Sequence, residues 1–226
     1  MEDYHSRPEF MTVMSSYLSG NRVEAEKAVT ELLKKHPADS SLQLLLGNLK
    51  YTVGLLGEAA THYERALELD PGLCQAWYKL GVCYVRMGKL NEALVAFRKN
   101  VAAECGSHAM SFYWMGLINS FIGDDDKALE AFTALHRESE ESLLANFFLA
   151  QLRMRRNEHE EALRLLKELQ AVSPEFAEVH YLMGKVYADM HKNIEAIQCF
   201  RKTIELNPAD KRARLEYERL YEVPPL

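Results

Sequence analysis

Apolar and small residues recur along this 226-residue chain with a period of 34 residues. When the chain is laid against itself, six units align, and they start at Ser6, Ser40, Cys74, Ala109, Leu143 and Ala177. The third unit holds one extra residue, in the stretch "AAECGSHA", and a partial seventh unit starts at Lys211. A fixed period of this length predicts stacked copies of one supersecondary unit.

Three positions within each unit indicate where helices must touch. The twentieth position is alanine in every unit, at Ala25, Ala59, Ala93, Ala128, Ala162 and Ala196. The twenty-fourth position holds Val29, Tyr63, Phe97, Phe132, Leu166 and Phe200. The eighth position holds Gly47, Gly81, Gly116 and Gly184, with Val13 and Ala150 as variants. Since residues four apart share a helix face, we expect a buried face on one helix and close helix contacts at the small residues.

Glycine and proline mark the turns. The fifteenth position is glycine in four units, at Gly20, Gly54, Gly88 and Gly123, and proline closes four units, at Pro37, Pro71, Pro174 and Pro208. Each unit is therefore predicted to be a helix, a tight turn and an antiparallel helix, with roughly 13 residues in each arm. One such pair cannot bury its own apolar stripe, so neighbouring units must stack.

This spacing resembles the tetratricopeptide repeat family. The family pattern of aromatic, leucine-glycine, tyrosine, alanine and phenylalanine is clearest in Trp77, Leu80, Gly81, Tyr84, Ala93 and Phe97, and the resemblance covers residues 6–210. It implies an all-α fold, a right-handed α-solenoid of six helix-turn-helix repeats with a C-terminal capping helix. The repeats are expected at residues 6–39, which diverge most from the pattern, and at 40–73, 74–108, 109–142, 143–176 and 177–210.

The two ends of the chain are expected to differ from the repeats. Residues 1–5 are predicted to be frayed. Residues 211–226 are predicted to form a capping helix and a tail, in which Leu215, Leu220 and Tyr221 cover the last repeat while charged residues face water. The prolines in "VPPL" then stop the helix.

In the family, the first helices of successive repeats line a concave inner surface, and positions two, five, nine and twelve of each unit point into it. Carried onto this sequence, the resemblance implies a groove rich in aromatic and apolar side chains. The candidate groove residues are Phe10, Met14, Tyr17, Leu44, Asn48, Tyr51, Tyr78, Val82, Tyr113, Leu117, Phe147, Gln151, Met154, Tyr181 and Lys185. A contiguous exposed apolar patch usually marks an interaction site. An aromatic stripe at helical spacing also arises from core packing, and that interpretation stays open.

Such a groove suits a protein partner, either an amphipathic helix or an extended apolar segment held by aromatic anchors. The polar residues expected to set its direction and register are Asn48, Lys79, Arg86, Arg155 and Lys185. We therefore predict an adaptor, scaffold or chaperone. The alternative is a structural role, as a subunit of a larger assembly or as a self-associating scaffold that uses the convex face or the repeat ends.

One more specific role in the family is not expected. Some relatives grip the C-terminal carboxylates of heat-shock chaperones with lysine and asparagine in one repeat, asparagine in the next, and lysine and arginine in the third. Only Asn48 matches, because Leu44 replaces its partner lysine, and Met110 and Trp114 replace the basic pair. Without that cationic pair a dicarboxylate has no charge-assisted bidentate seat.

Charge and hydropathy narrow the partners further. A formal charge of −6 argues against nucleic acid, which requires a basic surface, and Glu216 and Glu218 interrupt the densest basic stretch, "KRARLEYER". No apolar run reaches the ~18 to 20 residues of a membrane span, and the start, "MEDYHSRPEF", lacks the pattern of a signal peptide. We predict no membrane insertion and a cytoplasmic location, with the nucleus as the alternative.

No set of residues indicates catalysis, a metal site or a cofactor. None of the eight histidines pairs at the i, i+4 spacing of a helical metal site, and no phosphate-binding glycine loop occurs. The run "GDDDKA" lacks calcium-ligand spacing, so Asp124, Asp125 and Asp126 are expected to cap the following helix. The four cysteines have no metal-ligand spacing and are expected to be reduced thiols. The chain is therefore not expected to be an enzyme.

Overall fold

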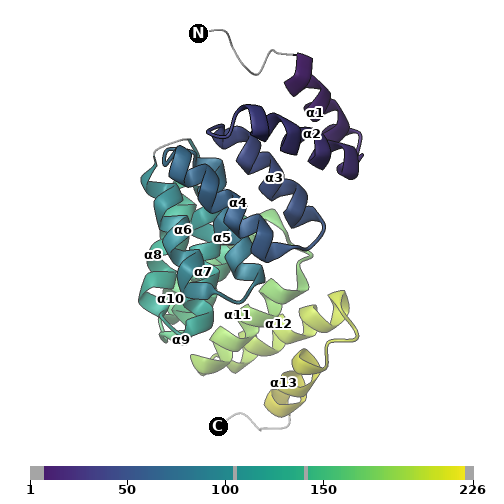
Figure 1. Cartoon of the computed structure of the whole chain (residues 1–226). Helices are drawn as coiled ribbons and strands as arrows, with labels where there is room; N and C mark the ends of the chain where they lie inside the picture. The colour runs from purple at the N-terminus through teal and green to yellow at the C-terminus, as the bar shows by residue number, and fades with distance from the viewer. Residues whose placement is uncertain (1–7, 104–105, 140–141, 222–226) are drawn as a thin grey trace. The chain divides into compact units, whose positions relative to one another are not determined.

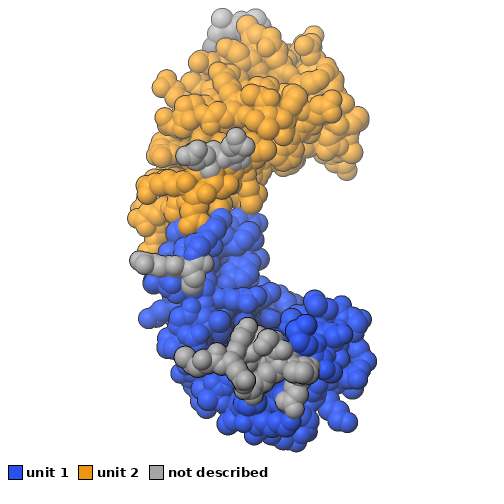
Figure 2. Space-filling model, turned by 90° about the horizontal axis from the view of Figure 1, so that it is seen from above, with its two compact units in different colours: residues 1–115 blue, residues 116–226 orange. Residues whose placement is uncertain are grey.

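The computed structural model describes residues 8–103, 106–139 and 142–221. These residues form thirteen α-helices and no strand (Figure 1). The chain divides into two compact units, residues 1–115 and residues 116–226, which Figure 2 colours separately. The all-α class predicted from the 34-residue period is confirmed.

Each unit is built from consecutive helices joined by short turns. Unit 1 contains α1 (Pro8–Leu18), α2 (Arg22–Lys35), α3 (Ser40–Thr52), α4 (Leu56–Leu69), α5 (Cys74–Arg86) and α6 (Leu90–Ala102). The boundary between the units falls within α7 (Ala109–Ile122). Unit 2 contains α8 (Asp125–Glu138), α9 (Leu143–Arg155), α10 (His159–Val172), α11 (Ala177–Asp189), α12 (Asn193–Leu206) and α13 (Lys211–Tyr221). Within each of these two sets every helix packs on the one before it, as stacked helix-turn-helix pairs require.

The buried face predicted from the sequence forms the core of each unit. The six alanines at position twenty and the six residues at position twenty-four are all 0% exposed. Glycine at position eight lies directly against the ring at position twenty-four, since a Cβ on Gly81 would stand 2.6 Å from Cε1 of Phe97. The same 2.6 Å separates the pairs Gly47 and Tyr63, Gly116 and Phe132, and Gly184 and Phe200. Glycine therefore sets how closely the two helices of a repeat approach.

The turns inside the repeats need a left-handed residue. Four of them use the glycines at position fifteen, and Gly88, for example, has φ +74°. The last two repeats place Asn157 at φ 60° and His191 at φ 59° in the same position. The glycine pattern did not predict these two residues, because a Cβ makes the left-handed region unfavourable for most side chains.

The acidic run at the start of α8 caps the helix and also forms ion pairs. Asp124 caps the helix as predicted, because its carboxylate accepts a hydrogen bond of 3.1 Å from the backbone N–H of Lys127. The Lys127 side chain bonds the same carboxyl group and lowers its pKa. Asp125 and Asp126 lie in the first turn of α8 and also pair with Arg155 and Arg156, at the end of α9 and in the turn that follows.

The last helix, α13, covers the C-terminal end of unit 2 (yellow in Figure 1). Ala213 is 0% exposed, and Tyr217 and Leu220 pack against the cluster around Phe200. Leu215 is 67% exposed and Tyr221 is 71% exposed, so the prediction that both cover the last repeat is wrong. Ala213, Tyr217 and Leu220 follow the i, i+4, i+7 spacing of one helix face, and the other two residues lie off that face.

The cysteines are not all reduced. Cys83 and Cys199 are free thiols, and burial raises the pKa of Cys199 to about 11. Cys74 takes part in a disulfide, so the prediction of four reduced thiols is wrong, and Cys105 lies outside the described residues. Spacing along one helix excludes a bond between Cys74 and Cys83 and does not bear on other cysteine pairs.

The described part of the chain was also compared with what a membrane span and a metal site require. None of its helices combines the length and the apolar character of a membrane span. No three histidine, cysteine, aspartate or glutamate side chains within it come together as a metal site would require.

Candidate partner-binding surface

The fifteen candidate groove residues all lie on the first helices of their repeats, and we call them the first-helix strip. In unit 1 they are Phe10, Met14 and Tyr17 on α1, Leu44, Asn48 and Tyr51 on α3, Tyr78 and Val82 on α5, and Tyr113 on α7. All of these except Leu44 are half-buried, so part of each side chain reaches the surface. Leu44 is 8% exposed and belongs to the core cluster around Tyr63, so it contributes packing more than surface.

Unit 2 carries the remaining members of the first-helix strip. They are Leu117 on α7, Phe147, Gln151 and Met154 on α9, and Tyr181 and Lys185 on α11. Each of these six side chains is half-buried. Each unit therefore presents its own set of partly exposed aromatic and apolar side chains.

The aromatic rings of the strip are anchored by rings beneath or beside them. The centroid of Tyr78 lies 6.1 Å from that of Phe97, and the centroid of Tyr181 lies 5.9 Å from that of Phe200. In both pairs the second ring is the fully buried one at position twenty-four of the same repeat. Each of these two strip rings therefore packs in part on the core and remains partly exposed. The core interpretation of the stripe accounts for the packed part of these two rings, and the binding interpretation stays a prediction.

Phe147 packs differently, and its contacts include a residue that the sequence pattern missed. Its ring meets Phe148 edge to face at 5.6 Å and stacks on Phe176 at 5.9 Å. Phe176 is 46% exposed and precedes α11, so it lies outside the first-helix positions used to define the strip. The signal in the sequence was a phenylalanine two residues after Pro174, just before the first helix of the last repeat.

Two of the polar residues expected to orient a partner, Arg86 and Arg155, contact neighbouring first helices. The Arg86 guanidinium lies 4.7 Å from the centroid of the Tyr51 ring, which is a cation–π distance. Arg155 donates to Ser120 at 2.8 Å and to Asp125 at 2.7 Å. The contacts with Tyr51 and Ser120 join the first helix of one repeat to that of the next, so both arginines help to fix the strip.

In the last repeat of unit 2, two strip residues contact the capping helix α13. Lys185 pairs with Glu216 of α13 at 3.3 Å. The Arg212 guanidinium lies 4.4 Å from the centroid of the Tyr181 ring. The capping helix therefore contacts two side chains of the strip, and a partner bound to unit 2 would meet Tyr181 and Lys185 in contact with α13.

Asn48 is held by a buried tyrosine. The hydroxyl of Tyr63 donates to Oδ1 of Asn48 at 2.9 Å. Burial, more than any neighbouring charge, raises the pKa of Tyr63, so this hydroxyl stays protonated and remains a donor. With Oδ1 accepting from Tyr63, the carboxamide N–H group is the end that Asn48 can offer to a partner.

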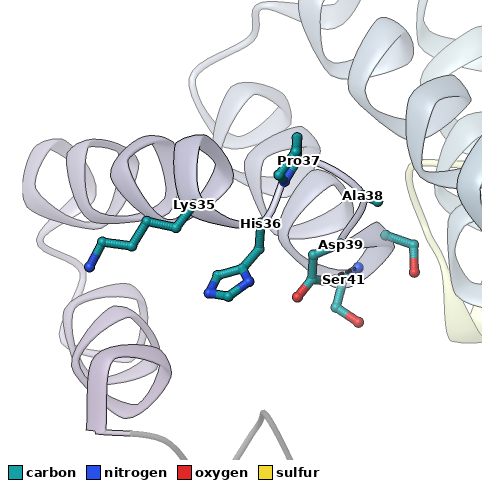
Figure 3. Close-up of a pocket in the computed structure, with 7 residues that line it drawn as sticks. Lys35, His36, Pro37, Ala38, Asp39 and Ser41 are labelled. Carbon is teal, nitrogen blue, oxygen red and sulfur yellow. Dashed lines mark hydrogen bonds between the residues drawn. The ribbon is translucent and has the colours of Figure 1, made fainter.

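A separate hollow of about 600 Å³ lies at the turn between α2 and α3 of unit 1. Figure 3 shows the His36 ring, the Asp39 carboxylate and the Ser41 hydroxyl directed to the same side of this turn. Asp39 caps α3, because its Oδ1 accepts from the backbone N–H groups of Ser41 at 2.9 Å and Leu42 at 3.0 Å. The hollow is lined by one continuous turn, and its only carboxylate, that of Asp39, already caps α3. We therefore interpret the hollow as a feature of the turn and not as a ligand site.

Comparison with known families gives one consistent result. Models described as tetratricopeptide repeat match residues 19–73, 62–95, 123–186 and 177–210. These matches fall in both units of the chain.

Among curated proteins, the chain is similar to subunits of larger complexes. It is 26% identical over 196 residues to anaphase-promoting complex subunit 3 of Schizosaccharomyces pombe, which covers 85% of this chain and 29% of that protein. It is 25% identical over 218 residues to the BBSome complex member bbs-4 of Caenorhabditis elegans, covering 88% of this chain and 46% of that protein. The chain thus spans less than half the length of these relatives.

Among solved structures, the chain is similar to YrrB and to MamA. YrrB, described as a TPR protein with an unusual peptide-binding site, aligns with a TM-score of 0.76 at 25% identity, over 86% of this chain and 100% of that one. MamA aligns with a TM-score of 0.69 at 23% identity, over 83% of this chain and 98% of that one. The second likeness bears on the fold alone.

Proposed function

Because the chain belongs to the tetratricopeptide repeat family, we propose that it is an interaction scaffold that holds a segment of another protein on the first-helix strip. The observation that carries this proposal is the set of half-buried aromatic rings on the strip, of which Tyr78 and Tyr181 are anchored on fully buried core rings. Rigid aromatic anchors bury apolar area at a low cost in conformational entropy. The partner is an amphipathic helix or an extended apolar segment.

The expected affinity follows from the number and kind of anchors. Each buried aromatic or aliphatic contact contributes roughly 1 to 3 kcal/mol, and ordering of the partner offsets much of the sum, so a dissociation constant of about 1 μM is expected. The carboxamide of Asn48 supplies a donor within the strip of unit 1. The peptide-binding description of YrrB, with which this chain shares 25% identity, supports the same assignment.

A matched pair of substitutions tests the proposal. Val82 is half-buried on the strip face of α5, whereas Val95 is 53% exposed on α6, the second helix of the same repeat. Peptides that bind the wild-type chain would be selected from a phage-displayed random library and measured against Val82→Glu and Val95→Glu. We expect a loss of about tenfold or more for Val82→Glu, because a carboxylate then faces an apolar ligand, and little change for Val95→Glu.

Melting curves of both variants must first match that of the wild type. Selected peptides that bind Val82→Glu as tightly as wild type, or that lose affinity for Val95→Glu alone, would show that the strip is not the binding surface.

A second candidate function is a structural role, as a subunit of an assembly or a self-associating scaffold. It is favoured by exposed apolar side chains away from the strip, since Leu18 is 77% exposed and Val23 is 83% exposed on either side of the turn between α1 and α2. The similar proteins named as members of complexes agree with such a role. Sedimentation equilibrium of wild type and of Leu18→Glu/Val23→Glu distinguishes the two, because only self-association through this end predicts a change in mass.

A further inference from the structure

A hollow of about 330 Å³ lies between α4 and α5 in unit 1. It is lined by Glu64, Leu67 and Glu68 of α4 and by Trp77 and Leu80 of α5. These two helices belong to consecutive repeats and pack against each other (Figure 1). None of the five lining residues is a member of the first-helix strip, so the hollow is a separate feature of the molecule.

The floor of the hollow is apolar and one wall is aromatic. Leu67 is 6% exposed and Leu80 is 4% exposed, and both belong to the core cluster around Tyr63. Trp77 is half-buried beside them, and its indole N–H donates to the backbone carbonyl of Pro71 at 2.9 Å. That bond fixes the ring and uses its only donor, so the indole meets a ligand through its π system and not through a hydrogen bond.

The rim of the hollow is acidic. Glu64 and Glu68 are four residues apart and therefore lie on the same side of α4, and both are exposed. Glu64 accepts a hydrogen bond from the Tyr84 hydroxyl, and Glu68 accepts one from Arg65 at 2.6 Å. A carboxylate offers about four acceptor sites, so each group keeps capacity for a further donor.

We propose that this hollow takes the side chain of a lysine that projects from a protein partner. The four-carbon stem would cover Leu67 and Leu80, while the ammonium group would lie against the Trp77 ring and between the two carboxylates. An ammonium with three freely directed donors suits two carboxylates on successive turns of a helix.

The chain itself provides a neighbouring example of this chemistry. Nζ of Lys89 lies 5.7 Å from the centroid of the Tyr84 ring, and the Tyr84 hydroxyl is the group bonded to Glu64. The ammonium group of Lys89 thus lies over the aromatic ring next to the hollow. The hollow should attract an ammonium group more strongly, because it offers a tryptophan ring in place of tyrosine and has two carboxylates.

The test uses the full chain labelled with ¹⁵N and two short peptides. The probe is acetyl-Ala-Lys-Ala-amide, and its control is acetyl-Ala-Gln-Ala-amide, which has a shorter stem, a polar end and no charge. The chain has two tryptophans, so its spectrum shows two indole N–H signals, and the spectrum of Trp77→Phe assigns the one from Trp77. The lysine peptide is expected to shift the Trp77 signal in a saturable manner and to leave the Trp114 signal in place.

Charge variants separate the hollow from the overall acidity of the protein. Glu64→Gln/Glu68→Gln is expected to weaken the lysine peptide roughly fivefold or more, which is the size of an exposed cation–π or ionic contact. The matched control is Glu161→Gln/Glu168→Gln, which removes two exposed carboxylates from α10, both paired with Arg164. It should change the affinity by less than about twofold. Because all four glutamates are exposed, both double variants should keep the wild-type melting curve.

Two results would overturn the proposal. If the glutamine peptide shifts the Trp77 signal as far as the lysine peptide does, the hollow does not recognise an ammonium group. If the control pair on α10 weakens the lysine peptide as much as the pair on α4, the attraction comes from net charge and not from this site. Both results are independent of peptide binding on the first-helix strip, so this proposal and the proposed function can fail separately.

Discussion

Replacing Gly81 with alanine should drive a methyl group into the ring of Phe97. The new Cβ would lie 2.6 Å from Cε1 and 2.8 Å from Cδ1 and Cζ, well inside the ~3.5 to 4.0 Å of an ordinary carbon contact. The ring cannot easily yield, because Phe97 is 0% exposed and its centroid lies 6.1 Å from that of Tyr78 and 6.4 Å from that of Trp114.

The magnitude follows from two opposing terms. Overpacking a close-packed core destabilises by roughly 1 to 3 kcal/mol, and alanine recovers about 1 kcal/mol over glycine inside a helix. The 2.6 Å contact is well inside normal carbon separation, so we expect a net loss in the free energy of unfolding of up to about 2 kcal/mol for Gly81→Ala. At the same two positions the fifth repeat has Ala150 and Leu166, both 0% exposed. Where alanine replaces the glycine, the residue opposite it is therefore leucine, which is smaller than phenylalanine.

That comparison predicts a rescue. Phe97→Leu alone should destabilise by about 1 to 2 kcal/mol, less than the roughly 3 to 5 kcal/mol for removal of a whole ring. In the double variant the leucine vacates the space that the methyl group introduced by Gly81→Ala needs, so the combined loss should fall short of the sum by about 1 kcal/mol or more. Urea denaturation of the wild type, the two single variants and the double variant measures this coupling free energy.

Gly88→Ala is the control. Gly88 has φ +74° and nothing within 4 Å of a built Cβ, so alanine there strains the backbone by roughly 1 to 2 kcal/mol without touching a ring. Phe97→Leu should not rescue it. If the losses of Gly81→Ala and Phe97→Leu add within about 0.5 kcal/mol, or if Phe97→Leu rescues Gly88→Ala equally, the contact between glycine and ring does not set the helix spacing.

Three further predictions follow from the packing and the charges. Ala93→Leu should lower the free energy of unfolding by roughly 1 to 3 kcal/mol because Ala93 is fully buried, and an unchanged urea midpoint would contradict this. His191→Gly should raise the free energy of unfolding by about 1 kcal/mol by removing a Cβ from a left-handed turn at φ 59°, whereas a lower midpoint would show that the His191 side chain stabilises the fold by more than this strain. Asp210 accepts from the Arg212 side chain and from the backbone N–H groups of Ala213 and Arg212, which lowers its pKa. Its stabilising effect is therefore complete above the usual aspartate pKa of about 3.9 and is lost as the pH falls through the lowered value, so Asp210→Asn should remove this part of the acid transition followed by circular dichroism.

Much of the fold was predictable because the helix contacts recur in every repeat. The same close contact between helices requires alanine at position twenty and a larger side chain at position twenty-four in each of the six repeats. The sequence therefore shows the same requirement six times, which makes the pattern easy to recognise. The individual details were less predictable. The disulfide of Cys74 and the exposed side chains of Leu215 and Tyr221 each occur once, so no internal repetition indicated them.

The candidate surface divides in the same way. The sequence placed the fifteen residues of the strip on the first helices, since their spacing relative to the 34-residue period is a local property. It could not show that Arg86 packs on Tyr51 or that Lys185 pairs with Glu216, because those partners belong to different repeats. The hollow beside Trp77 could not be predicted from the sequence either, because Glu64 and Trp77 are thirteen residues apart and lie on two different helices.

The sequence by itself determined the helices of the six repeats, their pairing and the positions that they bury, because these depend on spacings within about 34 residues that the chain repeats six times. Tertiary structure alone decided which side chains remain partly exposed, which charges are already paired, and where a cavity opens. Those properties depend on the shape of the partner helix at each contact, and the spacing of residues along one helix does not contain that information.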